Sequence, residues 1–376
     1  MKAILCLEDG KSFNAQGDFG TECLGEVIIN TAVVGYQEMI TDPVNAGKIL
    51  VFTYPLIGNY GCAPKFNEST KAWVSGLVMK EKSKIYSNWQ AKFSLDDFLK
   101  TQKKLAIDHL DTRTLTVHLR EKGPLVGIIS TLEFDPQKLL EKINKFKQQL
   151  KKSLLPEVSV KKLYSSGKSG KKIAVLDLGI SLSLLGQLER LGFSLTVFPY
   201  NASAKQILAI KPKGLVLSSG PENDCGLEAV ARNIKPLIGK LPILGVATGG
   251  QVLAAAFGAR LIRLKLGHRG VNYPIARPGT FKGEITAQNH GYAIDRDSLR
   301  KIKEIKVTAY NLNDHTIEEI ESRKLKMIAV QYNPVSAGFN QVHAILIKFS
   351  QLIQPARTDC LRQSGPTGSK QKEKNA

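Results

Sequence analysis

The chain contains 376 residues, of which 43% are hydrophobic and 23% are charged. A single hydrophobic core rarely keeps growing beyond about 250–300 residues, so this length predicts two domains. No segment approaches the roughly 20 uncharged apolar residues that cross a bilayer, and no apolar signal-peptide core begins the chain. We therefore expect a cytoplasmic protein with no membrane partner.

The cysteines and histidines are too scattered along the sequence to indicate a disulfide framework or a metal site. The five cysteines include no CxxC pair, which favours reduced thiols over a disulfide framework or zinc ligands. The six histidines are equally dispersed, so we expect no metal site.

The net charge of +20 is the one unusual bulk property. Much of it is lysine in runs such as 301–306 and the segment from residue 370 onward, and such runs usually mark solvated faces. No nucleic-acid-binding motif or interleaved aromatic platform accompanies them. Nucleic acid is therefore not an expected partner. A polyanion site stays open, and its affinity would have to fall with added salt.

Residues 1–135 predict a strand-rich α+β domain. The first strand enters a hairpin at Asp9-Gly10, a pair that favours a two-residue turn with both central residues at positive φ. Ser94 is a plausible N-cap for the first helix. The expected elements are strands at 2–7, 25–30 and 48–53 and helices at 94–99 and 111–121.

Residues 136–171 form a basic linker by composition. A lysine-rich helical stretch at 139–155 leads into Leu163-Tyr-Ser-Ser-Gly-Lys-Ser-Gly-Lys-Lys172. Glycine, serine and lysine without apolar periodicity predict a flexible connection there. At the other end of the chain, the residues after about 355 are polar, so we expect a disordered tail at 356–376.

Residues 172–355 alternate strands and helices, the pattern of a doubly wound, mostly parallel α/β sheet. In such a sheet, ligands bind beyond the carboxyl ends of the strands. The expected strands are 172–177, 194–198, 214–218 and 241–246, and the expected helices are 183–192, 251–257 and 341–353. One face of the last helix carries four apolar residues: Val342, Ile345, Leu346 and Phe349.

Gly245-Val-Ala-Thr-Gly249 stands between the expected strand 241–246 and the expected helix 251–257. This is the spacing of a strand-to-helix elbow that presents a nucleophile at its central residue. Glycines avoid collisions in so sharp a turn, and the helix N-terminus lowers the pKa of a thiol. Here the central residue is Ala247, and a methyl group cannot attack a carbonyl. The spacing alone is also typical of a packing turn.

The wider segment, Leu241-Pro-Ile-Leu-Gly-Val-Ala-Thr-Gly-Gly-Gln-Val-Leu253, resembles the nucleophile segment of class I glutamine amidotransferases. That family has a cysteine at the position of Ala247 and a histidine at the position of Gly250. Six further motifs, in the same order along the chain, are similar to the carbamoyl-phosphate synthase small-chain family, and the match runs from about residue 3 to 353. These motifs are Gly35-Tyr-Gln-Glu-Met-Ile-Thr-Asp-Pro43, Phe52-Thr-Tyr-Pro-Leu-Ile-Gly-Asn-Tyr60, Ser87-Asn-Trp89, Asp111-Thr-Arg-Thr-Leu115, Leu266-Gly-His-Arg-Gly-Val-Asn-Tyr-Pro274 and Thr286-Ala-Gln-Asn-His-Gly-Tyr-Ala293.

The chain departs from this family at each position of the catalytic triad. The resemblance implies a histidine base and an orienting glutamate in a V-Q-Y-H-P-E segment, whereas this chain has Val330-Gln-Tyr-Asn-Pro-Val335. Asn333 carries a neutral amide that cannot accept a proton at physiological pH, and Val335 has no acceptor that could orient a ring. Together with Ala247, these residues predict a chain that cannot hydrolyse glutamine.

The glutamine pocket that the resemblance implies is also altered. Glu222, in Gly220-Pro-Glu-Asn-Asp224, replaces the second glycine of the family's G-P-G-D-P oxyanion loop and adds bulk and negative charge there. Val44 stands where the family has a glutamine-contacting serine, and Thr248 replaces a leucine. Weak amide binding stays open because five pocket positions still match: Gly220, Gln251, Asn289, Gly291 and Tyr292.

No other residue is expected to take over the lost chemistry. Cys225 lies close to the oxyanion loop in sequence, but no paired base is evident for it. We interpret His290 as a hydrogen-bonded pocket residue, with a general base as the alternative. We interpret His268 as a structural residue of the loop after the elbow helix.

The resemblance implies a heterodimer in which ammonia from glutamine passes to a large subunit. That subunit makes carbamoyl phosphate from bicarbonate and ATP for arginine and pyrimidine synthesis. We expect this chain to serve as a structural subunit for synthesis from free ammonia, without a cofactor of its own, since ATP and Mg would belong to the large subunit. The alternative is a repurposed, non-catalytic pseudo-amidotransferase with a regulatory or ligand-binding role.

Overall fold

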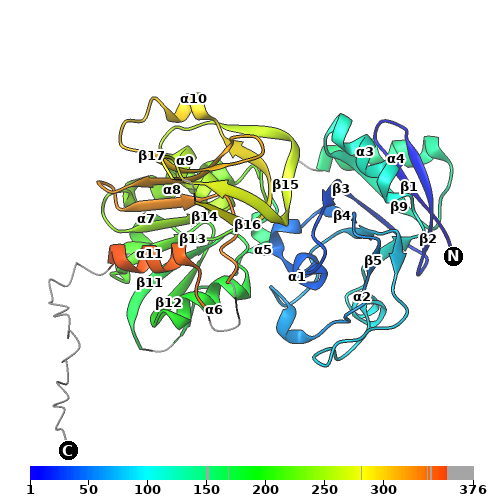
Figure 1. Ribbon diagram of the computed structural model, residues 1–376, viewed down its shortest axis with the longest axis horizontal. Helices are drawn as coiled ribbons and strands as arrows, with labels where there is room; N and C mark the ends of the chain where they lie inside the picture. The colour runs from blue at the N-terminus through cyan, green and yellow to red at the C-terminus, as the bar shows by residue number, and fades with distance from the viewer. Residues whose placement is uncertain (150–151, 168, 281, 337, 339–340, 354–376) are drawn as a thin grey trace, which may run out of the picture.

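The computed structural model describes residues 1–149, 152–167, 169–280, 282–336, 338 and 341–353. It consists of a β-barrel unit and a unit built on a long mixed sheet, which lie side by side (Figure 1). The tail expected at 356–376 lies outside the described residues. In the part of the chain that is described, no helix is long and apolar enough to cross a membrane.

The N-terminal unit is a closed barrel with the strand order β1-β2-β8-β6-β4-β3-β9. Aliphatic side chains such as Leu5 and Ile107 fill one apolar cluster of the unit, and a second cluster packs α1 and α2 on the barrel wall. The barrel strands are β1 (Lys2–Leu7), β2 (Ser12–Gly17), β3 (Glu22–Asn30), β4 (Lys48–Phe52), β6 (Gly76–Val78), β8 (Leu105–Asp108) and β9 (Leu125–Ser130). The other elements are α1 (Tyr36–Thr41), α2 (Leu95–Thr101), α3 (Thr112–Lys122) and the short pair β5 (Leu56–Ile57) and β7 (Glu81–Lys82).

Two local predictions for this unit have different outcomes. Ser94 caps α2 as expected, because its hydroxyl accepts a hydrogen bond of 3.1 Å from the Asp97 N–H. The predicted hairpin is confirmed, because β1 pairs antiparallel with β2, but the predicted two-residue turn is wrong, since Gly10 takes a positive φ of 87° whereas Asp9 does not. The Gly10 N–H donates to the Leu7 carbonyl at 2.9 Å, so the loop is a wider turn that is closed by a left-handed glycine.

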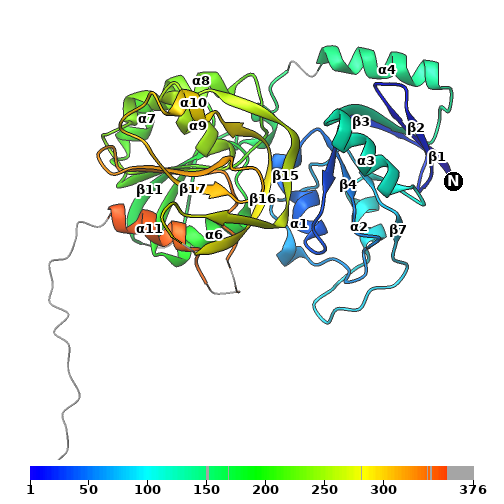
Figure 2. The ribbon, with the colours of Figure 1, turned by 45° about the horizontal axis from the view of Figure 1, so that its top comes forward.

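Much of the predicted linker is ordered. The helix α4 (Pro136–Gln149) packs Leu139 and Ile143 against β1 and β9, and it lies along the outside of the barrel (Figure 2). The prediction of a flexible connection is wrong at β10 (Tyr164–Ser166), which pairs antiparallel with β12. Backbone groups make these bonds, so a strand at a sheet edge needs no apolar periodicity. Residues 150–151 and 168 lie outside the described residues.

The C-terminal unit confirms the predicted doubly wound α/β architecture. Its sheet has the order β10-β12-β11-β13-β14-β19-β18-β16-β15-β17, with parallel pairing from β12 to β19 and antiparallel pairing beyond. The helices α7, α8 and α9 cover one face and α6 and α11 cover the other (Figure 2), each over its own apolar cluster. The strands are β11 (Lys171–Asp177), β12 (Phe193–Pro199), β13 (Gly214–Leu217), β14 (Ile243–Val246), β15 (Leu261–Ala276), β16 (Gly283–Ile294), β17 (Lys306–Asn311), β18 (Ile317–Ser322) and β19 (Met327–Val330). The helices are α5 (Leu155–Val158), α6 (Leu182–Arg190), α7 (Ala204–Ala209), α8 (Leu227–Ile234), α9 (Thr248–Ala256), α10 (Arg296–Leu299) and α11 (Ala344–Ile353).

The predicted helix boundaries near the site shift by a few residues. The helix α9 begins at Thr248, three residues before the predicted start, because the elbow itself supplies its first turn. The helix α11 begins at Ala344, three residues after the predicted start. The His343 side chain accepts a hydrogen bond from the Ile345 N–H at 3.2 Å and so marks the entry to α11.

Hydrogen bonds join the two units on both sides of the predicted pocket. The Thr31 N–H donates to the Arg269 carbonyl at 3.1 Å. The Asn289 side-chain amide donates to the Asn45 side chain at 3.1 Å. The pocket therefore lies where the barrel meets the carboxyl end of the parallel strands, as expected for a doubly wound sheet.

Candidate active site

The elbow between β14 and α9 has the backbone of a nucleophile elbow. Ala247 has φ 47° and ψ −114°, a conformation that costs a non-glycine residue about 1–3 kcal/mol. Its N–H donates to the Val330 carbonyl at 2.8 Å. A Cβ on Gly249 would lie 2.2 Å from the Leu217 carbonyl oxygen, and one on Gly245 would lie 2.6 Å from the Gly249 oxygen. The elbow therefore requires these glycines for close backbone approach.

The side chain at the centre of this elbow is chemically inert. Ala247 is 3% exposed and belongs to an apolar cluster that includes Val246, Val330 and Tyr332. The geometry that would present a nucleophile is intact, but the position holds only a methyl group.

Asn333 and Val335, where the resemblance implies a base and its orienting residue, border a cavity of about 560 Å³ between the two units. The Asn333 N–H donates to the Ala287 carbonyl at 2.9 Å, which fixes the segment after β19 beside β16. Asn333, Val335 and Asn289 all line this cavity, and Val335 is 58% exposed. The structure thus brings the two altered triad positions together with a retained pocket position.

The Glu222 carboxylate fills the part of the pocket where the resemblance implies contacts to glutamine. Its side chain is 4% exposed. One carboxylate oxygen accepts a hydrogen bond of 2.7 Å from the Gly291 N–H, and the other accepts one of 3.1 Å from the Gln251 side chain. Two donors that the resemblance assigns to the substrate are therefore bound to a side chain of the protein itself.

Two buried cations accompany this carboxylate. The Arg269 guanidinium lies 3.8 Å from Glu222, and Lys48 reaches the same region from β4 of the barrel. Burial opposes ionisation of Glu222, but attraction to Lys48 and Arg269 outweighs burial and lowers the pKa of Glu222. Burial lowers the pKa of Lys48, whose ammonium has no hydrogen-bond partner among the described residues.

These charged residues face a second cavity, of about 660 Å³, on the barrel side of the pocket. Gly291 and Tyr292 line it together with Lys48, Glu222 and Arg269. The sequence alone does not indicate Lys48 and Arg269 as site residues. A buried charge is recognisable only once its neighbours in space are known, although Arg269 lies within a motif that carries the family resemblance.

The remaining pocket positions hold the elbow and the oxyanion loop together. The Thr248 hydroxyl donates to the Gly220 carbonyl at 2.6 Å, so the residue that replaces the family leucine ties the elbow to the altered loop. The Gln251 amide also donates to the Tyr292 carbonyl at 3.1 Å. Val44 is 1% exposed in the short helix after α1 and offers no hydroxyl to a ligand.

The other candidates of the sequence analysis lie close to the pocket. Cys225 is exposed and lines the 660 Å³ cavity from the loop after the Glu222 segment. The histidines are dispersed along the sequence, but the fold brings His268 and His290 together: their ring centroids lie 4.9 Å apart on the paired strands β15 and β16. Antiparallel pairing joins residues that are 22 positions apart in sequence, and single-sequence spacing does not show this. Glu318, on β18, completes a buried cluster with them.

Comparison with known proteins finds a family match for each of the two structural units. Residues 5–129 match the family model described as carbamoyl-phosphate synthase small chain, CPSase domain, and residues 174–351 match glutamine amidotransferase class-I. Among similar curated proteins is a carbamoyl phosphate synthase small chain of Syntrophotalea carbinolica, 38% identical over 95% of this chain and 99% of that protein. One from Listeria monocytogenes is 39% identical over 94% of this chain and 97% of that protein.

A further relative is the carbamoyl phosphate synthase pyrimidine-specific small chain of Bacillus subtilis, which is 36% identical over 94% of this chain and 96% of that protein. These matches span both structural units, and each covers nearly the full length of the relative. The chain belongs to the carbamoyl-phosphate synthase small-chain family.

Proposed function

We propose that this chain is a carbamoyl-phosphate synthase small subunit that does not hydrolyse glutamine and that supports synthesis from free ammonia. The observation that carries the proposal is the Glu222 carboxylate, which accepts hydrogen bonds from the Gly291 N–H and the Gln251 amide inside the pocket. A ligand that needed those donors would have to displace a buried carboxylate from between two cations.

The chemistry of the triad positions supports the same conclusion. Glutamine hydrolysis in the family requires a nucleophile that attacks the amide carbon and a base that takes up its proton. Ala247 supplies no nucleophile, and the neutral amide of Asn333 supplies no base. Loss of such groups typically lowers the rate by about three to six orders of magnitude. An oxyanion forming near Glu222 would also meet a fixed negative charge instead of a bare backbone.

A large synthetase subunit is the proposed partner, and ATP and Mg would be bound there. The barrel unit offers an exposed apolar surface for such a contact, because Ile85 is 81% exposed and Trp89 is 89% exposed. Large exposed aromatic residues are enriched at the centres of protein interfaces. The scaffold of the subunit is thus retained where the catalytic groups are not.

The direct test is carbamoyl-phosphate formation by this chain together with the large subunit from the same organism. Glutamine and ammonium chloride are compared as nitrogen sources. We expect synthesis with ammonium and none above background with glutamine. Robust synthesis with glutamine would overturn the proposal, because another nucleophile would then have to operate.

A second candidate function is that of a non-catalytic, ligand-binding pseudo-amidotransferase. It is favoured by Lys48, whose ammonium has no hydrogen-bond partner in the part of the chain that the structure describes and lines the 660 Å³ cavity together with Arg269. Two buried cations against the single carboxylate of Glu222 leave room for a small anion. Co-purification with a large subunit from its own cells supports the first function. Absence of that partner together with calorimetric binding of a small carboxylate supports the second.

A further inference from the structure

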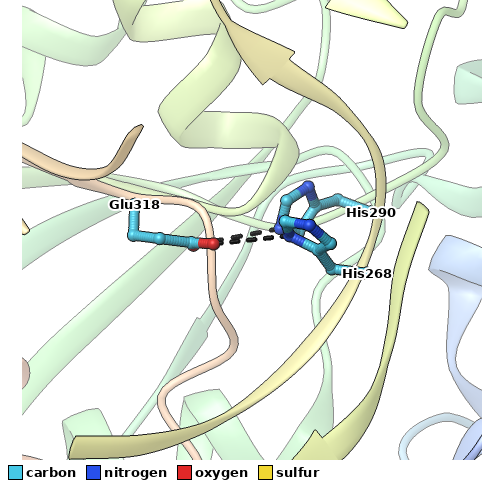
Figure 3. Close-up of side chains that lie close together, drawn as sticks. All are labelled: His268, His290 and Glu318. Carbon is cyan, nitrogen blue, oxygen red and sulfur yellow. Dashed lines mark ion pairs between the residues drawn. The ribbon is translucent and has the colours of Figure 1, made fainter. Parts of the chain in front are cut away.

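Three buried side chains from three neighbouring strands converge inside the C-terminal unit (Figure 3). His268 lies on β15, His290 on β16 and Glu318 on β18. Their side chains are 6%, 1% and 0% exposed, respectively. One potential ligand atom from each of the three residues lies within 4.8 Å of the other two.

The hydrogen bonds around His290 determine which atoms face the cluster. Its Nδ1 lies 2.9 Å from the Tyr292 carbonyl, which only accepts, so Nδ1 carries the hydrogen and Nε2 presents a lone pair. The Thr286 hydroxyl donates to the Tyr273 carbonyl at 2.9 Å and therefore accepts the Gln288 amide N–H at 3.0 Å. This fixes the Gln288 carbonyl oxygen 3.0 Å from the His290 Nε2.

His268 and Glu318 add further electron-rich atoms. Asp314 lies 2.9 Å from the His268 Nε2 and orients the ring so that Nδ1 points to Glu318 at 3.4 Å. One Glu318 oxygen accepts from the Asn311 amide at 2.9 Å. The other oxygen has no donor among the described residues and lies 3.9 Å from the His290 Nε2. The Asn311 amide also lies 3.4 Å from the His268 Nδ1, so it serves both His268 and the first Glu318 oxygen. The other Glu318 oxygen and the Gln288 oxygen face the His290 Nε2 lone pair with no donor between them among the described residues, which is unfavourable unless a cation lies there.

We propose that the His268 Nδ1, the His290 Nε2 and Glu318 bind a divalent metal ion of the zinc class. Two imidazoles and a carboxylate are ligands that zinc prefers, at bond lengths of about 2.0–2.2 Å, which place tetrahedral ligand atoms roughly 3.3 Å apart. The His268 Nδ1 lies 3.4 Å from one Glu318 oxygen, close to this value, and the His290 Nε2 lies 3.9 Å from the other oxygen. The two nitrogens therefore flank the carboxylate, and a small shift would bring them onto one ion. The Gln288 oxygen is positioned as a fourth ligand.

The surroundings of these ligands are those of a metal centre. Each histidine uses its other nitrogen to contact an oxygen acceptor, Asp314 for His268 and the Tyr292 carbonyl for His290, as metal-bound histidines do. Gln288 contacts His290 and also lines the 560 Å³ cavity, so the cluster lies one residue away from that cavity. A metal here would fix β15, β16 and β18 and act as a structural centre.

A proton is the competing occupant. Burial opposes a charged His268, but Glu318 and Asp314 together raise the pKa of its imidazole, so an imidazolium between the two carboxylates would also satisfy them. If the cluster binds a metal, the chain should retain zinc and its Tm should rise with zinc. If a proton occupies the cluster, neither should occur.

The test loads the purified full-length chain, stripped with EDTA, with zinc chloride, and then measures retained zinc by elemental analysis after desalting. We expect about one zinc per chain and a higher Tm with zinc than with EDTA. Cobalt chloride should give the visible absorption of a tetrahedral nitrogen and oxygen site. A chain that retains no zinc and has the same Tm in both conditions would overturn the proposal and favour the proton.

Matched variants separate this site from other zinc-binding groups on the surface. Glu318→Gln keeps the shape of the side chain and should abolish zinc retention. Asp314→Asn, at a partly exposed residue outside the ligand set, should weaken affinity by about 10–100-fold, and it keeps the test valid if the first variant does not fold. His118→Gln, in the barrel unit, should leave zinc retention unchanged. Zinc retention by Asp314→Asn with wild-type affinity would place the metal elsewhere.

Discussion

The Glu222 carboxylate should stabilise the fold as well as fill the pocket, and Glu222→Gln tests this. The substitution keeps the shape of the side chain but removes the charge that lies 3.8 Å from Arg269 and attracts Lys48. Removing one partner of a buried ion pair costs about 3–5 kcal/mol, because the other charge stays buried. In a unit of roughly 200 residues, each kcal/mol lowers Tm by about 2–4 °C. We therefore expect Tm to fall by roughly 6–20 °C at neutral pH.

The pH dependence of this effect has a defined sign. Since the pKa of Glu222 is lowered in the folded chain, its stabilisation is present above the ordinary glutamate pKa of about 4.3. It is lost as pH falls through the lowered value. Thermal melts of the wild type and the Gln variant should therefore differ most at neutral pH and converge in acid.

A second substitution shows whether the lost attraction is the cause. Lys48→Met in the Glu222→Gln background removes one uncompensated cation and should recover part of the lost Tm, whereas the two changes would simply add if the residues did not interact. If the Glu222→Gln variant has the same Tm as the wild type at neutral pH, the claim that the charge of Glu222 stabilises the fold is refuted. Strict additivity with Lys48→Met would refute the coupling between the two units.

The remaining predictions concern the elbow, the partner surface and a partly buried carboxyl, that of Asp42. The Ala247→Cys variant should release no glutamate from glutamine, because the new thiol has no base that activates it. Measurable turnover would mean that another residue acts as the base. Gly250→His restores the family's residue but places Cβ 2.7 Å from a carbonyl oxygen of β19, so stability should fall by about 1–3 kcal/mol, and an unchanged Tm would contradict the packing described. Trp89→Ser should weaken co-purification with the large subunit at constant Tm, whereas undiminished co-purification would move the interface elsewhere. Burial raises the pKa of Asp42 to about 7, so the folded chain prefers its neutral form and loses stability as pH rises from about 3.9 to about 7. Asp42→Asn should flatten the melting profile over that range, and a profile with the wild-type slope would argue against this role.

Sequence patterns predicted the elements that are fixed by interactions between residues close in sequence, and the strands that consist of a continuous apolar run. The strand β14 and the elbow after it could be read from Gly245 and Gly249, because close backbone approach leaves few other residues possible. The N-cap at Ser94 is a local hydrogen bond and was predicted for the same reason. Family resemblance then supplied the pocket positions, which spacing alone does not indicate.

The features that sequence missed are those set by contacts across the fold. The strand β10 is held by backbone bonds to β12, and its side chains need no pattern. Lys48 resembles a surface lysine in sequence, yet the second unit covers it and buries its ammonium. His268 and His290 become neighbours only through the register of β15 and β16. Resemblance indicated that Glu222 was unusual, but only the geometry shows which donors it binds.

The left-handed turn at Ala247 is enforced by its surroundings and not by its own side chain. The Val330 carbonyl and the glycines on either side impose φ 47° on a residue that has no chemical use for it. The backbone geometry of the elbow therefore does not depend on a reactive side chain, because it is retained although the central residue is alanine. An engineer who sought to install a different nucleophile here would inherit an aligned backbone and would need to redesign only side chains.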